Sequence, residues 1–217
     1  MDSFLCRVLS CVVHAAGATL PAVPEQFLDV LDGNDANSSS LVVVTRDEAR
    51  QHFRKSERRL LCSSRLITPL LEQHWQDEIA LRVERMWTAS RVLRRAVVLQ
   101  TAATQVPVEI ALLTVFLDNL PAKTAAEVQR ARQPFGTVLE SHQVEQQHSP
   151  AVFALTSPED VRLACTFFGL LQSEEAQSEQ LPDRIAGRLN TISDRAGNVM
   201  ALSLELLRPV HGAALLV

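Results

Sequence analysis

Apolar and polar residues alternate along part of this chain, with the period of two that is typical of a β-strand whose one face meets solvent. Residues 79–86 show this most clearly, with isoleucine, leucine and valine at every second position from 79 to 83. Residues 95–100, 108–117 and 199–207 are more continuously apolar, which favours buried strands. Two antiparallel hairpins are predicted: one pairs residues 95–100 with 108–117, and the other pairs residues 188–192 with 199–207.

Helices are expected between these strands. Thr68 and Pro69 are suited to the N-cap and the first position of one helix, and Ser157 is suited to the N-cap of another. A turn is expected at residues 134–136. The segments expected to be helical are 46–61, 69–75, 124–132 and 158–172. Because strands and helices do not alternate regularly, we expect an α+β fold with five or six mostly antiparallel strands.

Composition excludes several function classes. The chain has 217 residues, of which 47 % are hydrophobic, enough for one sizeable core. Its net charge of −4, without a basic stripe, argues against nucleic-acid binding. No apolar stretch reaches the roughly 20 residues of a membrane-spanning helix. Its four cysteines and six histidines show neither CxxC nor HExxH spacing, so we expect no metal site and no disulfide framework.

The first 46 residues differ in composition from the rest. Residues 1–18 resemble a weak secretory signal that would be cleaved after Ala18, although Asp2, Arg7 and His14 fit such a signal poorly. We therefore expect an N-terminal extension over residues 1–46, comprising a targeting segment or linker, and a folded domain over residues 47–217. A cytoplasmic location is favoured, with secretion as the alternative.

Two lone charges interrupt the apolar runs: Arg95 opens one and Glu205 lies inside another. A charge in a buried strand costs free energy unless it is paired, and a ligand can be the partner. The alternatives are an ion pair between the two residues, or exposure at a strand end. Ala201 and Ser203 share a face with Glu205, leaving space for a ligand or for a packed helix. Glu109 also interrupts a strand; we expect it to face water, and the alternative is that it adds charge to the pocket.

Five segments, taken in order, resemble the chorismate pyruvate-lyase family, nearest to its divergent branch, over residues 47–210. They are LCSSRLITPLL at 61–71, DEIALRV at 77–83, RAVVL at 95–99, QPFGTVL at 133–139 after Leu120-Pro121, and the closing hairpin at 188–192 and 200–207. The resemblance implies a six-stranded antiparallel sheet with helices packed on one side and an enclosed ligand pocket. It also implies elimination of pyruvate from chorismate to leave 4-hydroxybenzoate, without metal or organic cofactor.

The same resemblance assigns roles to five residues. Arg95 matches the arginine that holds the ring carboxylate, and Glu205 matches the acidic group at the far end of the pocket. Ile67, Ala111 and Phe135 match positions that contact the ring. A guanidinium suits a carboxylate because it binds both oxygens. A desolvated Glu205 would suit proton donation to the leaving oxygen.

Two functions from different classes therefore remain. The first is a cofactor-independent lyase acting on chorismate or a similar cyclohexadiene carboxylate. The second is a non-catalytic protein of the same fold that binds a small aromatic acid. In either case the expected partner is a small molecule, with no nucleic acid and no membrane span, and the expected state is a monomer because the fold encloses its own pocket.

Overall fold

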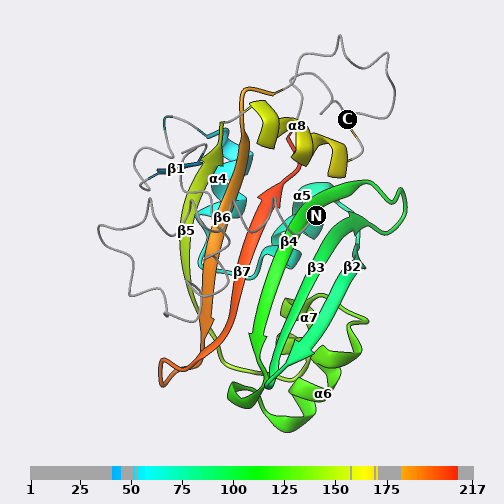
Figure 1. Cartoon of the computed structure of the whole chain (residues 1–217), viewed down its shortest axis with the longest axis vertical. Helices are drawn as coiled ribbons and strands as arrows, with labels where there is room; N and C mark the ends of the chain where they lie inside the picture. The colour runs from blue at the N-terminus through cyan, green and yellow to red at the C-terminus, as the bar shows by residue number, and fades with distance from the viewer. Residues whose placement is uncertain are drawn as a thin grey trace.

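The chain folds into one antiparallel sheet with helices on both faces (Figure 1). The computed structural model describes residues 41–44, 51, 53–156, 158–168, 170 and 182–209. Its elements are β1 (Leu41–Val44), α4 (Lys55–Leu61), α5 (Ile67–Trp75), β2 (Ile79–Ala89), β3 (Val92–Thr101), β4 (Pro107–Phe116), η1 (Leu117–Asn119), α6 (Ala122–Arg130), α7 (Phe135–Ser141), β5 (Gln147–Leu155), α8 (Pro158–Phe167), β6 (Ile185–Ser193) and β7 (Val199–Leu207). The expected α+β class is confirmed.

The sheet has the strand order β1-β5-β6-β7-β4-β3-β2, and each neighbouring pair is antiparallel. Both expected hairpins form, β3 with β4 and β6 with β7, and β7 pairs with β4 to join them. A short seventh strand, β1, extends the six-stranded sheet by pairing with Val152–Leu155. It lies within the first 46 residues, whereas residues 1–40, including the candidate signal segment, lie outside the described part.

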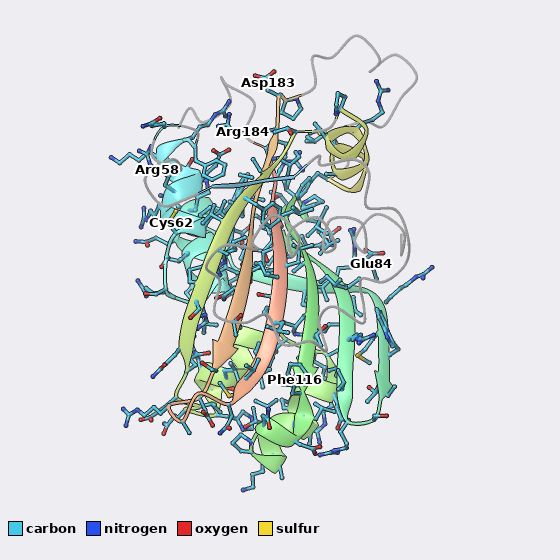
Figure 2. The ribbon with its side chains drawn as sticks, turned by 60° about the vertical axis from the view of Figure 1, so that its left-hand side comes forward. Arg58, Cys62, Glu84, Phe116, Asp183 and Arg184 are labelled. Carbon is cyan, nitrogen blue, oxygen red and sulfur yellow. The ribbon has the colours of Figure 1, made fainter. Side chains whose placement is uncertain are left out.

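The two faces of the sheet carry different helices. Helix α8 packs on one face, where its Val161 and Ala164 belong to the same core cluster as Val98 and Ile110. Helices α4, α5, α6 and α7 pack on the other face, so the expectation of helices on a single side is wrong. Figure 1 shows α8 near one end of the sheet and α6 and α7 near the other. In Figure 2, Arg58 and Cys62 mark α4 at one side of the sheet, and Glu84 marks β2 at the opposite edge.

Strand β5 was not expected from the sequence, because Pro150 interrupts it. Proline lacks the N–H that a central strand would donate, and it is tolerated where a strand is an edge. Among the described residues, β1 pairs with residues 152–155, so β6 is the single strand neighbour of β5 at Pro150 in this part of the chain. The other half of β5, which pairs with both β1 and β6, is a regular, buried part of the sheet.

Two helix starts also differ from expectation. Helix α5 begins at Ile67 with Leu66 as the N-cap, so Thr68 and Pro69 lie inside its first turn. Proline is tolerated there because first-turn N–H groups have no partner within the helix. The turn expected at residues 134–136 is instead the start of α7, with Pro134 as the N-cap. Both helices begin above the face of the sheet opposite α8. Within the described residues, no helix is both long and apolar enough to cross a bilayer.

Candidate functional site

A cavity lies between the sheet and the first turns of α5 and α7. Its volume, counted as the space open to the centres of water-sized spheres, is about 60 Å³. The two helix starts are tightly packed above it, since a Cβ atom on Gly136 of α7 would lie 2.9 Å from Leu66 Cδ2. The lining residues are Leu66, Ile67, Thr68, Leu81, Arg95, Val97, Leu99, Glu109, Ala111, Leu113, Pro134, Phe135, Gly136, Arg188, Asn190, Ile192, Ser203 and Glu205.

Strand pairing explains why these residues form one floor. One row across β3, β4, β7 and β6 contains Val97, Ala111, Glu205 and Arg188. The next row contains Arg95, Leu113, Ser203 and Asn190. Successive residues of a strand point to opposite faces, so every second residue of each strand reaches the cavity. The small side chain of Ala111 lies at the centre of this floor.

All five residues singled out from the sequence line this cavity. Arg95 comes from β3, Ala111 from β4 and Glu205 from β7, while Ile67 and Phe135 are the first residues of α5 and α7. The structure thus brings together positions that are up to 138 residues apart in the chain. Their assigned roles in contacting a ligand stay predictions.

Glu205 is already paired, with a residue that sequence reasoning missed. Arg188, its neighbour across β6 and β7, donates from Nε to Glu205 Oε2. Ser203 Oγ donates to the other carboxylate oxygen at 2.7 Å. Arg188 Nη1 also donates to the carbonyl oxygens of Ser63, at 3.1 Å, and Leu60, at 3.4 Å. Glu205 is therefore an acceptor in a buried ion pair, and a carboxylate in that state has no proton to donate.

Arg95 is buried without such a partner. Its side chain is 1 % exposed, and Nε and Nη1 have no hydrogen-bond partner among the described residues. Strand spacing places its Cα about 12 Å from that of Glu205, since β4 lies between them. An ion pair between the two, one alternative from the sequence, does not form within the described structure. Burial lowers the pKa of Arg95 to about 10, so the guanidinium stays charged at neutral pH.

Glu109 also faces the cavity, so the expectation that it faces water is wrong. It shares a face of β4 with Ala111 and Leu113, and its side chain is buried. Burial raises the pKa of Glu109 well above its ordinary value, the Glu205 charge raises it further, and Arg188 lowers it. Glu109 Oε2 has no hydrogen-bond partner among the described residues.

Asn190 adds an amide to the same floor. Its Nδ2 lies 3.0 Å from His148 Nδ1, while its Oδ1 has no partner among the described residues. The pKa of His148 is lowered, mainly by burial and then by the charge of Arg188. A neutral His148 ring nitrogen can accept from the Asn190 amide, which fixes the amide orientation. The Asn190 oxygen is then an unpaired acceptor.

The cavity therefore combines an apolar wall with three incompletely paired polar groups, those of Arg95, Glu109 and Asn190. Buried polar groups in native proteins are almost always hydrogen-bonded, so unpaired ones around a hollow mark a place for a polar molecule. Among the described residues, no three His, Cys, Asp or Glu side chains gather as metal ligands would.

Comparison with known proteins gives structural matches alone: no family model and no curated protein matches the chain. The ligand-binding domain attributed to a GntR-family transcriptional regulator from Bordetella bronchiseptica is 14 % identical, with 62 % of this chain and 88 % of that chain covered and a TM-score of 0.41. A GntR-family transcriptional regulator from Bacillus cereus is 8 % identical, covering 65 % and 100 %, with a TM-score of 0.40. The effector domain of PhnF from Mycobacterium smegmatis is 12 % identical, covering 68 % and 95 %, with a TM-score of 0.43.

The expected function, a chorismate lyase, is corrected by the geometry of the site. The named matches are regulator and effector domains, and none of the three bears the name of a lyase. The chemistry of the site gives the physical reason. Glu205, the expected proton donor, is held in an ion pair with Arg188, and chorismate, a dianion, would meet only one unpaired guanidinium. The assignment as an enzyme that releases pyruvate and 4-hydroxybenzoate is therefore wrong.

Proposed function

We propose that this chain binds a small organic carboxylate, such as an aromatic acid, in the cavity beneath α5 and α7 without converting it. Arg95 holds the carboxylate, and Ile67, Ala111 and Phe135 contact the ring. The observation that carries this proposal is the guanidinium of Arg95, which is 1 % exposed, lines a hollow, and has two nitrogens without a partner among the described residues.

The free energy of a buried charge supports the proposal. An unpaired charge in an apolar interior costs several kcal/mol, so a protein retains one where a ligand compensates for it. A planar guanidinium donates two parallel hydrogen bonds to a carboxylate, which gives both strength and orientation. The apolar side chains of Val97, Leu99 and Phe135, which line the cavity, lower the local dielectric constant and so strengthen that contact further.

The contrast between the two cavity arginines supports binding in preference to catalysis. Arg188 has its carboxylate partner within the fold, and its Nη1 donates to backbone oxygens. Arg95 lacks these partners, so an incoming anion completes the site without displacing an existing ion pair. Glu205 then acts by fixing Arg188, and takes no part in proton transfer.

Titration calorimetry with benzoate, and with benzamide as its neutral counterpart, tests this proposal. We expect benzoate to bind the full chain and benzamide to bind at least tenfold more weakly, because only benzoate offers two anionic oxygens. Arg95→Met should abolish this difference. The matched control is Arg94→Met, which removes the adjacent arginine from the opposite face of β3. Equal binding of benzoate to the wild type and to Arg95→Met would refute the proposal.

A further inference from the structure

The cavity has a second polar end, which the role proposed for Arg95 leaves unused. Glu109 and Arg95 lie on neighbouring strands, two cross-strand rows apart, so their Cα atoms are about 14 Å apart by strand geometry. Val97 and Ala111, which are directly paired, lie between them on the floor. A ligand whose carboxylate contacts Arg95 would therefore extend over Ala111 toward Glu109.

Charged or titratable side chains from several elements lie around Glu109. Strand β7 contributes Glu205, β6 contributes Arg188, and β3 contributes Arg95. Strand β5 contributes His148, which is bonded to Asn190. The neighbouring residue Val108 borders a separate small hollow whose charged and titratable members are Glu57 of α4, His74 of α5 and Arg208 after β7.

Two causes favour the neutral form of Glu109 and one opposes it. Burial raises the pKa of Glu109, the nearby Glu205 carboxylate raises it as well, and the Arg188 guanidinium lowers it. Because Arg188 and Glu205 form an ion pair, their opposite effects on the pKa of Glu109 largely cancel, and burial remains the main cause of the increase. A neutral carboxyl group has an O–H donor, which an ionised carboxylate lacks.

This inference rests on the proposed function. We propose that the protonated carboxyl of Glu109 selects the ligand by donating a hydrogen bond to a ligand oxygen, at the end of the ligand opposite the ligand's own carboxylate. The ligand class is a monocarboxylate with an oxygen acceptor across a ring or short chain. Charge supports the singly charged form: the cavity contains two guanidinium groups and one ion-paired carboxylate, so one anion balances it. A second anionic group would approach Glu205 and Glu109 without a cation of its own.

A pH dependence follows from this arrangement. As pH rises and Glu109 loses its proton, the cavity loses both the donor and its net positive charge, so the affinity for an anion falls. Glu109→Gln keeps an N–H donor and cannot ionise. Its affinity should therefore stay level over the same pH range.

The experiment compares benzoate with 4-hydroxybenzoate, which adds one oxygen opposite the carboxylate. Calorimetric titrations of the full chain run from about pH 5, just above the ordinary glutamate pKa of about 4.3, to about pH 8. We expect the wild type to prefer 4-hydroxybenzoate by about five- to tenfold at the lower pH, as one buried hydrogen bond provides. The preference should decline with pH in the wild type and persist in Glu109→Gln. Glu109→Leu should bind both probes alike.

The outcomes separate this inference from the proposal on which it rests. Arg95-dependent binding of both probes, with equal affinity at every pH, overturns the role of Glu109 and leaves that of Arg95 intact. A preference for 4-hydroxybenzoate that grows with pH also overturns it, because an ionised Glu109 would then be accepting from the hydroxyl group. Binding of neither probe, or binding that Arg95→Met leaves unchanged, overturns the proposed function itself. If Glu109→Leu does not fold, the pH series of the wild type and Glu109→Gln decides.

Discussion

The two faces of the central sheet are made from alternate residues of the same strands, and they differ sharply in charge. On β7, Leu202, Leu204 and Leu206 point toward α8 and pack in an apolar cluster. Between them, Ser203 and Glu205 point toward the cavity under α5 and α7. The same division holds on the other strands that form the cavity floor.

Apolar clusters on both faces stabilise the fold, whereas the buried charges gather on the cavity face alone among the described residues. Burying apolar area on the α8 face favours folding, at roughly 25 cal/mol per Å². The cavity face holds Arg95, Glu109, Arg188 and Glu205 at 5 % exposure or less, and each buried charge or polar group lowers stability unless it is paired. The apolar clusters on the two faces therefore offset the cost of the unpaired groups that line the cavity.

Breaking the ion pair of the cavity face should have the largest effect on stability. Arg188→Met leaves Glu205 buried without its cation, and we expect the free energy of unfolding to fall by about 3–5 kcal/mol. Urea denaturation measures this change. As the control, Arg188→Met combined with Glu205→Leu removes both charges and should recover most of the loss. Failure of the double variant to recover would show that the pair is not the cause.

A cavity made on the apolar face should have a slightly smaller effect. Leu204→Ala removes a side chain that is 1 % exposed, and the expected loss in unfolding free energy is about 2–5 kcal/mol. Leu204 lies on the face opposite the cavity, so Leu204→Ala, if it folds, should bind benzoate with the same affinity as the wild type. A loss of benzoate binding in the folded variant would contradict the separation of the two faces.

Because Gly187 has no side chain, the bulky Phe153 side chain can lie against β6 on the α8 face. A Cβ atom there would lie 2.6 Å from Phe153 Cζ and 2.7 Å from the backbone oxygen of Glu205. Gly187→Ala should therefore lower the free energy of unfolding by about 1–3 kcal/mol, as overpacking does. Adding Phe153→Leu relieves only the side-chain contact, so partial recovery is expected. An unchanged midpoint in urea for Gly187→Ala would show that the packing is looser than described.

The smallest expected effect is a pH dependence of stability on the cavity face. The pKa of Glu109 is raised on folding, so the native state binds more protons than the unfolded state as pH increases above the ordinary glutamate value. The stability that Glu109 contributes is thus present at low pH and is lost as pH rises toward its raised pKa. Relative to Glu109→Gln, the wild type should become less stable with pH in urea titrations. An opposite slope would show that Glu109 is stabilised in its charged form.

Much of the fold could be predicted from the sequence, because strand signals are local. The alternation at 79–83 and the apolar runs around 95–100 and 199–207 identified three strands directly. Strand β5 was missed because Pro150 weakens its pattern, and its pairing with β6 depends on residues distant in the chain. The start of α7 was interpreted as a turn because proline and glycine flank Phe135.

The candidate site was only partly accessible from the sequence. Arg95 and Glu205 were noticeable as lone charges in apolar runs, and they do line one cavity. Which arginine pairs with Glu205 depends on the register of β6 and β7, and Arg188 was therefore not considered as the partner. Glu109 was expected to face water, although its spacing of two from Ala111 was the signal that places both on one face.

The central claim is that Arg95 is a buried cation kept for an anionic ligand, and unfolding free energies with and without benzoate test it most directly. Without ligand, we expect Arg95→Met to be at least as stable as the wild type, because it no longer buries an unpaired charge. With benzoate at a hundred times its dissociation constant, the wild type should gain about 2.7 kcal/mol and the variant nothing. A ligand-free variant that loses several kcal/mol, and that benzoate stabilises as much as it does the wild type, would contradict the account.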